Sequence, residues 1–264
     1  VVLWYGILPT GHTFIYTMSS VQHYNRVARV PPAQCRELRT AHRAAKHVLI
    51  SSAAVLSRGS MQGCHVVDFA CGRGGDLTKC IGCASYTGVD SAEDALRELH
   101  RRAAEMGIPV RTFYADAACM PATPCDVAMC NFALHYFCDT KEHCALLLDK
   151  VCACMRANGT FCGTYEKRVG AVQWGDMHHA VIGDCVDAIE WRVPWHDVVR
   201  MAHARGLALV YHMPLHCLHE GSDPNIWCFI MRSQVQHCGT KETAQSSAGT
   251  PLNHPGAQQA RGRP

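Results

Sequence analysis

The sequence has few charges and no long hydrophobic run. Only 18% of its 264 residues are charged and the formal net charge is +3, so the chain lacks the strongly basic balance of many nucleic-acid binders. Any contact with RNA must therefore come from a local basic patch. The apolar opening segment, VVLWYGILPTGHTFIYT, is interrupted by glycine, proline and histidine, and falls short of the ~20 apolar residues of a membrane helix. We therefore expect no membrane anchor.

Several ligand-binding signatures are also missing. Cys80 and Cys83 form a CxxC pair, but no second CxxC and no HxxxH at finger spacing completes a set of four zinc ligands. Leu77 stands where a dinucleotide-binding GxGxxG would need its third glycine, and the Walker pattern is absent. We therefore expect no metal ion and no dinucleotide or P-loop site.

The length and apolar content are those of one globular domain. With 264 residues, 48% of them hydrophobic, the chain can bury a sizeable core, and one α/β domain with extensions is expected. Its 17 cysteines lie in strand-like or helix-like segments such as VAMCNF and DKVCACM, not in the loops of a small disulfide scaffold. We therefore expect reduced thiols and an intracellular location, in the nucleus or, for a viral protein, in the host cytoplasm or nucleus.

Short apolar runs alternate with amphipathic segments along the middle of the chain. Residues 22–55 have the spacing of one or two helices, which would form an N-terminal helical cap. Strands are predicted at 65–70, 86–90, 110–116, 125–131, 160–166, 207–213 and 225–233, and helices at 92–106, 141–156 and 195–206, with one more helix after the glycine turn that follows residue 70. This alternation favours an α/β fold with a doubly wound, mostly parallel seven-stranded sheet and helices on both faces.

The same pattern divides the chain into three parts. Residues 1–21 are expected to be a poorly ordered N-terminal extension, and residues 22–235 a single catalytic domain that includes the helical cap. Residues 236–264 are rich in glycine, proline and small polar residues, which cannot bury enough apolar surface to order themselves, so a disordered tail is expected there.

The sharpest local signal is DFACGRGGD, from Asp68 to Asp76. A buried strand ends there in glycines that let a ligand approach the backbone closely. Asp90 closes the next strand, where a carboxylate can accept hydrogen bonds from both hydroxyls of an adenosine ribose, and Asp116 closes the third. Each acid alone could equally be a helix N-cap or a solvated strand end. Three acids at successive strand ends indicate a class I S-adenosylmethionine site, with Asp116 near the adenine.

Longer stretches around this site resemble a known family. NFALHYF lies at 131–137, HYNRV and HRAAKHVLI at 23–27 and 42–50, and EWRVPW and NIWCFI at 190–195 and 225–230. Together with DFACGRGGDL they resemble the mRNA cap guanine-N7 methyltransferases of cells and large DNA viruses, whose motifs are D-L-G-C-G-K-G-G-D-L, Q-F-A-L-H-Y, Y-N and N-W-x-K-S-x-L-I. The resemblance covers roughly residues 22–233. It implies a Rossmann-like, class I methyltransferase fold.

The resemblance implies roles for the residues on the cofactor side, which are Lys46, Asp68, Gly72, Asp90, Asp116 and Asn131. Lys46 would reach the methionine carboxylate, Gly72 and its neighbours would line the methionine moiety, and Asp90 and Asp116 would hold the ribose and the adenine. Asn131 takes the place of the family's Gln, and its shorter amide keeps the hydrogen-bonding groups with less reach.

The residues implied on the cap side are Arg73, Arg102, His135, Tyr136, Glu190 and Trp227. His135 and Tyr136 would contact the cap guanosine, and Glu190 would accept hydrogen bonds from the Watson–Crick edge of the guanine. Trp227 replaces a Tyr that the family generally has near the guanine, and an indole can still stack on a base. Arg73 and Arg102 are candidates for the cap triphosphate, although a solvated helix face would equally explain Arg102.

The resemblance therefore implies an mRNA cap guanine-N7 methyltransferase. Its cofactor would be S-adenosylmethionine, its product S-adenosylhomocysteine, and its substrate 5′-capped mRNA, with a guanylyltransferase as a possible capping partner. Guanine N7 carries a free lone pair, so no general acid or base is expected and proximity and orientation would provide the catalysis. The alternatives are another class I methyltransferase, acting on a small molecule, a protein or the cap 2′-hydroxyl, and a non-catalytic methyltransferase-like partner subunit.

Overall fold

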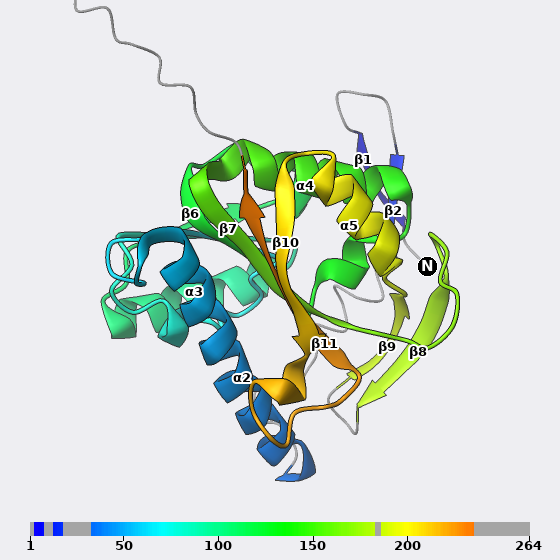
Figure 1. Ribbon diagram of the computed structural model, residues 1–264, viewed down its shortest axis with the longest axis horizontal. Helices are drawn as coiled ribbons and strands as arrows, with labels where there is room; N and C mark the ends of the chain where they lie inside the picture. Colours follow the sequence, from blue (N-terminus) through cyan, green and yellow to red (C-terminus); the bar gives the residue numbers. More distant parts are fainter. Residues whose placement is uncertain (1–2, 8–12, 18–32, 183–185, 235–264) are drawn as a thin grey trace, which may run out of the picture.

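The central element of the computed structural model is a seven-stranded sheet (Figure 1). The structure describes residues 3–7, 13–17, 33–182 and 186–234. In spatial order the strands are β10 (Leu207–Pro214), β11 (Ile226–Ser233), β7 (Met155–Glu166), β6 (Cys125–Asn131), β3 (His65–Phe69), β4 (Ser85–Asp90) and β5 (Val110–Tyr114). β7, β6, β3, β4 and β5 are parallel neighbours, and β11 runs antiparallel to both β7 and β10. The predicted seven-stranded, mostly parallel sheet is confirmed.

Helices cover both faces of this sheet. They are α2 (Ala33–Arg58), α3 (Glu93–Met106), α4 (Lys141–Cys154) and α5 (Trp195–His203), with short 3₁₀ helices η1 (Leu77–Lys79), η2 (Ala117–Cys119), η3 (Leu134–Phe137) and η4 (Leu215–Cys217). One core cluster joins α4 and α5 to the sheet through Val67 and Ala128, and a second joins α2 and α3 to it through Val66 and Val127. Successive strand residues thus point into opposite cores, which explains why the central strands are apolar without interruption.

Most predicted elements are confirmed, with shifts at their ends. The helix predicted at 141–156 ends at Cys154, and β7 begins at Met155, earlier than the predicted start at 160. The helix predicted within 22–55 corresponds to α2, which runs on to Arg58; residues 22–32 lie outside the described part of the chain, as does the predicted tail, 236–264. Among the described residues, no helix is both long enough and apolar enough to cross a membrane.

The helix predicted after the glycine turn is wrong. Only η1, of three residues, follows the turn, because Gly82 takes a positive φ of 89° and the chain must enter β4 at Ser85.

Two hairpins do not appear among the predicted elements. β8 (Met177–Ile182) and β9 (Val186–Trp191) pair antiparallel with His178 opposite Glu190. β1 (Leu3–Ile7) and β2 (Thr13–Thr17) pair within the segment expected to be a poorly ordered extension, and their LWYGI and TFIYT sequences are rich in the aromatic and β-branched residues of strands.

The strand order brings the carboxyl ends of β3, β4, β6 and β7 to one edge of the sheet, where α/β folds bind ligands. α2 runs opposite to these strands. The Ala53 carbonyl accepts a hydrogen bond from Thr160 Oγ1 in β7, and Ser57 Oγ donates to the carbonyl of Asp126 near the start of β6, whereas Lys46 reaches the loop after β3. The N-terminal half of α2 therefore projects beyond the ligand-binding edge, as the lower helix of Figure 1 shows.

Candidate functional site

The turn after β3 has a left-handed backbone that brings peptide groups to its surface. Ala70, Gly72 and Gly74 have positive φ values of 58°, 51° and 69°. The Cys71 N–H donates to the Val89 carbonyl at 3.0 Å, which ties the turn to β4. A ligand can approach the backbone closely at Gly72, which carries no side chain, whereas a Cβ at Gly74 would collide with Leu77 and Leu99 of the core. Ala70 adopts the same conformation with a Cβ, at a cost of roughly 1–2 kcal/mol.

Asp90, at the end of β4, fixes the same turn. Its Oδ2 accepts the Gly72 N–H at 2.7 Å and its Oδ1 accepts the Ala92 N–H at 2.8 Å. Burial raises the pKa of Asp90, and these backbone hydrogen bonds favour the ionised form. Each carboxylate oxygen can accept a second hydrogen bond. Asp90 can therefore hold the turn and still accept the hydroxyls of a ribose.

A buried ionic cluster closes the turn at Asp76. Asp76 Oδ1 lies 2.7 Å from Lys46 Nζ and 2.9 Å from Lys79 Nζ, and Asp76 Oδ2 accepts a hydrogen bond from Asn131 Nδ2 at 3.0 Å. Burial opposes ionisation of Asp76, but the two lysines outweigh it and lower its pKa. The structure thus brings Lys46 and Asn131 together through a carboxylate that the sequence prediction did not include among the binding residues. The signal for Asp76 was its place at the end of the glycine motif.

Asn131 retains one unused polar atom at this point. Its Oδ1 is buried and accepts no hydrogen bond from any described residue. An amide oxygen of this kind suits an N–H donor such as a ligand ammonium group. Asn131 therefore fits a role beside the amino-acid part of a cofactor.

Asp68 lies deeper, beneath the turn. It is buried and accepts a short hydrogen bond from the Tyr86 hydroxyl. Burial and the nearby Asp76 carboxylate raise the pKa of Asp68. Its partner is thus a side chain of β4, and the contacts of Asp68 support the strands under the turn.

Asp116 follows β5 and lies beside Asp90, because the Ala115 N–H donates to the Asp90 carbonyl. Its Oδ1 caps η2 by accepting the Ala118 N–H at 2.7 Å, and its Oδ2 lies 3.4 Å from His143 Nε2. The His143 ring is also hydrogen-bonded to Asp139 at 2.6 Å. Burial alone would lower the pKa of His143, but the two carboxylates outweigh it and raise it to about 9. Asp116 therefore occupies the predicted position and also serves as a helix cap.

Three of the predicted cap-side residues lie together. His135 and Tyr136 stand on η3 with ring centroids 4.0 Å apart, and His135 Nε2 lies 3.5 Å from Glu190 Oε1 on β9. Burial lowers the pKa of His135 to about 3, so its ring is neutral at pH 7. Burial and the neighbouring Glu166 raise the pKa of Glu190 to about 7. At pH 7 the His135 ring is therefore uncharged, and Glu190 is close to half ionised.

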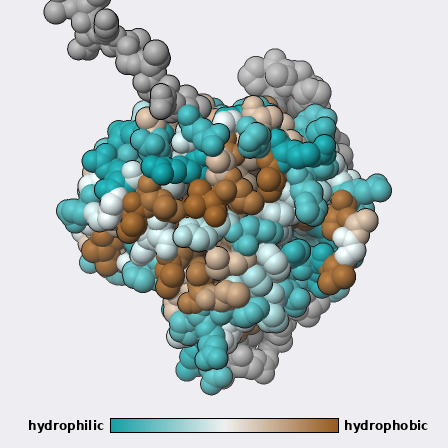
Figure 2. Space-filling model, viewed as in Figure 1, coloured by the Kyte–Doolittle hydropathy of each residue, from teal (hydrophilic) through white to brown (hydrophobic). Residues whose placement is uncertain are grey.

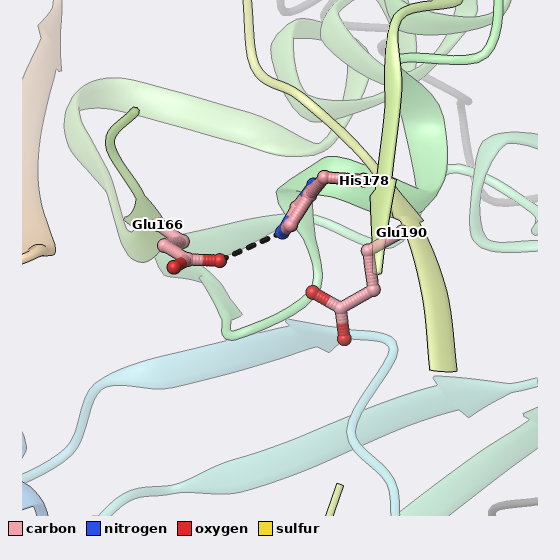
Figure 3. Close-up of side chains that lie close together, drawn as sticks. All are labelled: Glu166, His178 and Glu190. Carbon is pink, nitrogen blue, oxygen red and sulfur yellow. Dashed lines mark hydrogen bonds and ion pairs between the residues drawn. The ribbon is translucent and has the colours of Figure 1, made fainter. Parts of the chain in front are cut away.

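Glu166 and His178 hold the β8–β9 hairpin against the end of β7 (Figure 3). His178 Nε2 lies 2.9 Å from Glu166 Oε2, and Arg168 forms an ion pair of 2.7 Å with the other oxygen of Glu166. Glu166, His178 and Glu190 could offer three ligand atoms within 4.8 Å of one another to a metal ion. Each of the three already has a protein partner, because Glu166 pairs with His178 and Arg168, and Glu190 pairs with His135. The sequence prediction missed Glu166 and His178, since nothing local marks a contact between β7 and a later hairpin.

Trp227 lies in β11, opposite Tyr165 of β7. Lys167 Nζ stands 3.5 Å from the centroid of its ring, and the His212 ring lies 4.7 Å from it. Trp227 is half-buried at the strand ends that carry Glu166. No contact joins it directly to His135 or Glu190 among the described residues.

The two predicted triphosphate arginines have different surroundings. Arg73 is half-buried within the glycine turn. Arg102 forms an ion pair of 2.9 Å with Glu98 one turn earlier in α3, as expected for a solvated helix face. Arg73 lies in the glycine turn itself, whereas Arg102 lies on a helix face beside a carboxylate.

Comparison with known sequences places the chain beside one group of enzymes. Residues 16–169 match the sequence profile of the mRNA (guanine-N(7))-methyltransferase domain. Over 204 residues, 57% of this chain and 55% of the relative, it is 28% identical to mRNA cap guanine-N(7) methyltransferase 1 of Oryza sativa subsp. japonica. It is 30% identical to the Arabidopsis thaliana protein of that name over 55% of this chain and 54% of the relative. The chain spans about half the length of these relatives.

Solved structures with the same fold are methyltransferases. N-methyltransferase NodS from Bradyrhizobium japonicum, in complex with S-adenosyl-L-homocysteine, superposes with a TM-score of 0.60 at 13% identity, over 82% of this chain and 99% of that one. Magnesium protoporphyrin IX methyltransferase from Synechocystis gives a TM-score of 0.58 at 12% identity, over 81% and 94%. At such identities the likeness concerns the fold, which is the Rossmann-like fold of S-adenosylmethionine-dependent methyltransferases.

Proposed function

The chain belongs to the mRNA (guanine-N(7))-methyltransferase family, and on that premise we propose that it methylates N7 of the guanine in an mRNA cap, converting GpppN-RNA into m7GpppN-RNA. The observation that carries this proposal is the position of His135 and Tyr136 against Glu190 at the strand ends that also carry the glycine turn. This arrangement has two halves. The first, around the glycine turn, would hold an adenosine-like cofactor, and the second, around Glu190, would accept hydrogen bonds from a guanine.

The residues of the first half, on the cofactor side, fit S-adenosylmethionine. Asp90 has free acceptor capacity for the ribose, the left-handed turn at Gly72 leaves room for the methionine chain, and Asn131 Oδ1 offers an unused acceptor. The superposable NodS structure contains S-adenosyl-L-homocysteine, the corresponding product, which supports this choice of cofactor. When bound, S-adenosylmethionine supplies a methyl group activated by a positively charged sulfur.

The residues of the second half, on the guanine side, would bind the cap guanine and orient its N7 toward the methyl group. Glu190, when ionised, accepts hydrogen bonds from the N–H groups on the Watson–Crick edge of guanine. His135, which is buried, and Tyr136, which is half-buried, would flank that edge. N7 needs no deprotonation, and a His135 whose pKa is about 3 is uncharged at pH 7, with one ring N–H that can still donate a hydrogen bond. Catalysis then depends on holding the reacting atoms in line at roughly 3–3.5 Å.

The substrate would be a 5′-capped RNA. The chain has no lysine in a K-x-D-G context, so we infer that it does not add the guanylate itself and receives GpppN-RNA from a guanylyltransferase. That enzyme is the proposed capping partner.

Two single variants separate the halves of the proposal. Asp90→Ala removes the ribose acceptor and the partner of the Gly72 N–H, so we expect binding of S-adenosylmethionine to be lost in calorimetry. Glu190→Ala should bind the cofactor as the wild type does and lose cap methylation by at least ~100-fold, because guanine N–H groups would then be buried unpaired. Glu105→Ala, which removes an exposed carboxylate from α3, is the control and should change neither.

If both variants lost cofactor binding and cap methylation to the same extent, the division into a cofactor half and a guanine half would be contradicted. Cofactor binding by Glu190→Ala without any change in cap methylation would contradict the guanine half alone.

A further inference from the structure

One face of α2 continues from the core of the protein into solvent. Residues at alternating spacings of three and four lie on one side of a helix. On α2 the series 36, 39, 43, 46, 50, 53 and 57 has this spacing. Its C-terminal members pack on the sheet: Ile50 and Ala53 are fully buried, and Ser57 donates a hydrogen bond to β6.

The N-terminal members of the same face are all basic. They are Arg36, Arg39, Arg43 and Lys46, which we call the basic stripe. Lys46 points into the cofactor site, where it pairs with Asp76. Arg36 and Arg43 are exposed and Arg39 is half-buried. The one acid of α2, Glu37, lies on another side of the helix, because successive residues are turned by ~100°.

The basic stripe begins at the candidate site and leads away from it. The face that packs on the sheet passes the sheet edge at Lys46, so the three arginines continue this face along the half of α2 that projects beyond the edge. With a rise of ~1.5 Å per residue, they stand ~5, ~10 and ~15 Å beyond Lys46 along the helix axis. The tip of α2 is the lowest part of Figure 1, and the same place in Figure 2 is hydrophilic.

These arginines differ from the exposed arginines of α3. On α3, Arg97 pairs with Glu93 and Asp94, and Arg101 pairs with Glu98 and Glu105. No ion pair joins Arg36, Arg39 or Arg43 to an acid within the described ranges. Three like charges on one side of a helix repel one another at spacings of three and four residues. An anionic partner would relieve this repulsion.

We propose that the basic stripe binds the phosphates of the RNA that follows the cap. The proposal rests on the proposed function, since it takes the candidate site as the place where the capped end is held. A single strand that leaves this site along α2 meets a basic residue at each helical turn, from Lys46 to Arg36. The formal net charge of the whole chain is only +3, so this stripe would supply the local positive potential that RNA binding requires.

Contacts between these arginines and RNA phosphates would raise the affinity for long substrates and leave the rate of methyl transfer unchanged. Each phosphate contact to a single strand contributes roughly 0.7 to the slope of log K against log salt concentration, so three contacts contribute about 2. The cap dinucleotide GpppA ends before the stripe and should not respond to it.

The test compares Arg36→Gln/Arg39→Gln/Arg43→Gln with the wild type on GpppA and on capped RNA of about 20 nucleotides. The matched control is Arg97→Gln/Arg101→Gln/Arg200→Gln, which removes the same charge from exposed arginines paired with acids on α3 and α5. For the stripe variant we expect KM for capped RNA to rise at least tenfold, with kcat and the KM for GpppA within twofold of the wild type. The control should resemble the wild type with both substrates.

Binding of the same RNA, followed by fluorescence anisotropy in the absence of cofactor, gives a readout that does not need activity. The stripe variant should bind the RNA at least tenfold more weakly, with a salt slope smaller by about 2. Equal RNA affinity in wild type and stripe variant would overturn the proposal, as would an equal loss in the control. Retained RNA affinity with lost binding of a polyglutamate peptide would assign the stripe to an acidic protein instead.

The outcomes keep this proposal separate from the proposed function. If the wild type methylates neither GpppA nor capped RNA, the proposed function fails, and the anisotropy comparison still decides whether the stripe binds RNA. If GpppA is methylated normally and the stripe variant loses no RNA affinity, the stripe proposal alone fails.

Discussion

At the scale of single residues, burial determines the charge state of the cap pocket. His135 and Glu190 lie 3.5 Å apart, yet burial holds the pKa of His135 at about 3 and raises that of Glu190 to about 7. At pH 7 the histidine is neutral and the glutamate is near its midpoint. A guanine that donates two N–H groups would favour the ionised form of Glu190.

The raised pKa of Glu190 predicts the pH dependence of cap methylation. As pH falls through 7 the carboxyl becomes protonated and one of its two oxygens turns from an acceptor into a donor, so kcat/KM for a capped substrate should fall as pH decreases from 8 to 6. Glu190→Gln should be slow and lack this dependence. Initial rates at subsaturating GpppA measure both profiles. A wild-type profile that is flat from pH 6 to 8, or one kept by Glu190→Gln, would count against this role.

Residues of the site could be predicted where a motif carries them and not where only folding joins them. Asp90, His135 and Glu190 followed from strand ends and from resemblance. The partners of those residues did not follow, because Asp76 bridges α2 and β6, and Glu166 meets His178 only when a later hairpin folds back on β7. Contacts between residues this far apart in the sequence leave no local pattern from which they could be predicted.

At the scale of secondary-structure elements, the turn between β3 and η1 combines a left-handed backbone with a non-glycine residue. Ala70 has a φ of 58°, where the family motif quoted above has glycine. Its two glycine neighbours share the conformation without a Cβ. The turn therefore stores strain at the place where a ligand would approach the backbone.

Ala70→Gly should relieve this strain. The left-handed conformation costs alanine roughly 1–2 kcal/mol, and the greater freedom of glycine in the unfolded chain offsets about 0.5–1 kcal/mol of the gain. We expect the free energy of unfolding to rise by up to about 1 kcal/mol in urea denaturation. The control Ala133→Gly, at a buried residue with a φ of −140°, should instead lower it. A lower free energy of unfolding for Ala70→Gly, as for Ala133→Gly, would show that the backbone at Ala70 is not strained.

Element prediction succeeded where the hydrophobic period is strong and failed where elements are short. The strands β3, β4, β6, β7 and β11 are largely buried apolar runs, so their sequences mark them clearly. β8 and β9 carry polar residues such as His178 and Glu190, which stand opposite each other in the pairing. η1 was predicted as a longer helix because helices usually follow such turns in this fold class.

At the scale of the whole molecule, buried ion pairs connect elements that are distant in sequence. His143 on α4 pairs with Asp116 after β5 and with Asp139 before α4. Its pKa is raised to about 9, so the charged ring stabilises the folded state. This contribution is fully present below the unfolded pKa of about 6.5 and is lost as pH rises through about 9.

We therefore expect the free energy of unfolding to fall by on the order of 2 kcal/mol between pH 6 and 8.5 because of His143. Buried thiols with raised pKa values add their own loss at higher pH, so the comparison with His143→Gln isolates the imidazole. The difference between the two proteins in urea denaturation should shrink as pH rises. A difference independent of pH would contradict the assigned charge state.

We propose that the chain is an S-adenosylmethionine-dependent enzyme whose methyl acceptor is N7 of the cap guanine. The most direct measurement incubates the protein with methyl-labelled S-adenosylmethionine and GpppG-capped or uncapped RNA, then digests the product to locate the label. The account predicts label on N7 of the cap guanine of capped RNA and none on uncapped RNA. Equal transfer to uncapped RNA, or label on any other atom, would contradict it.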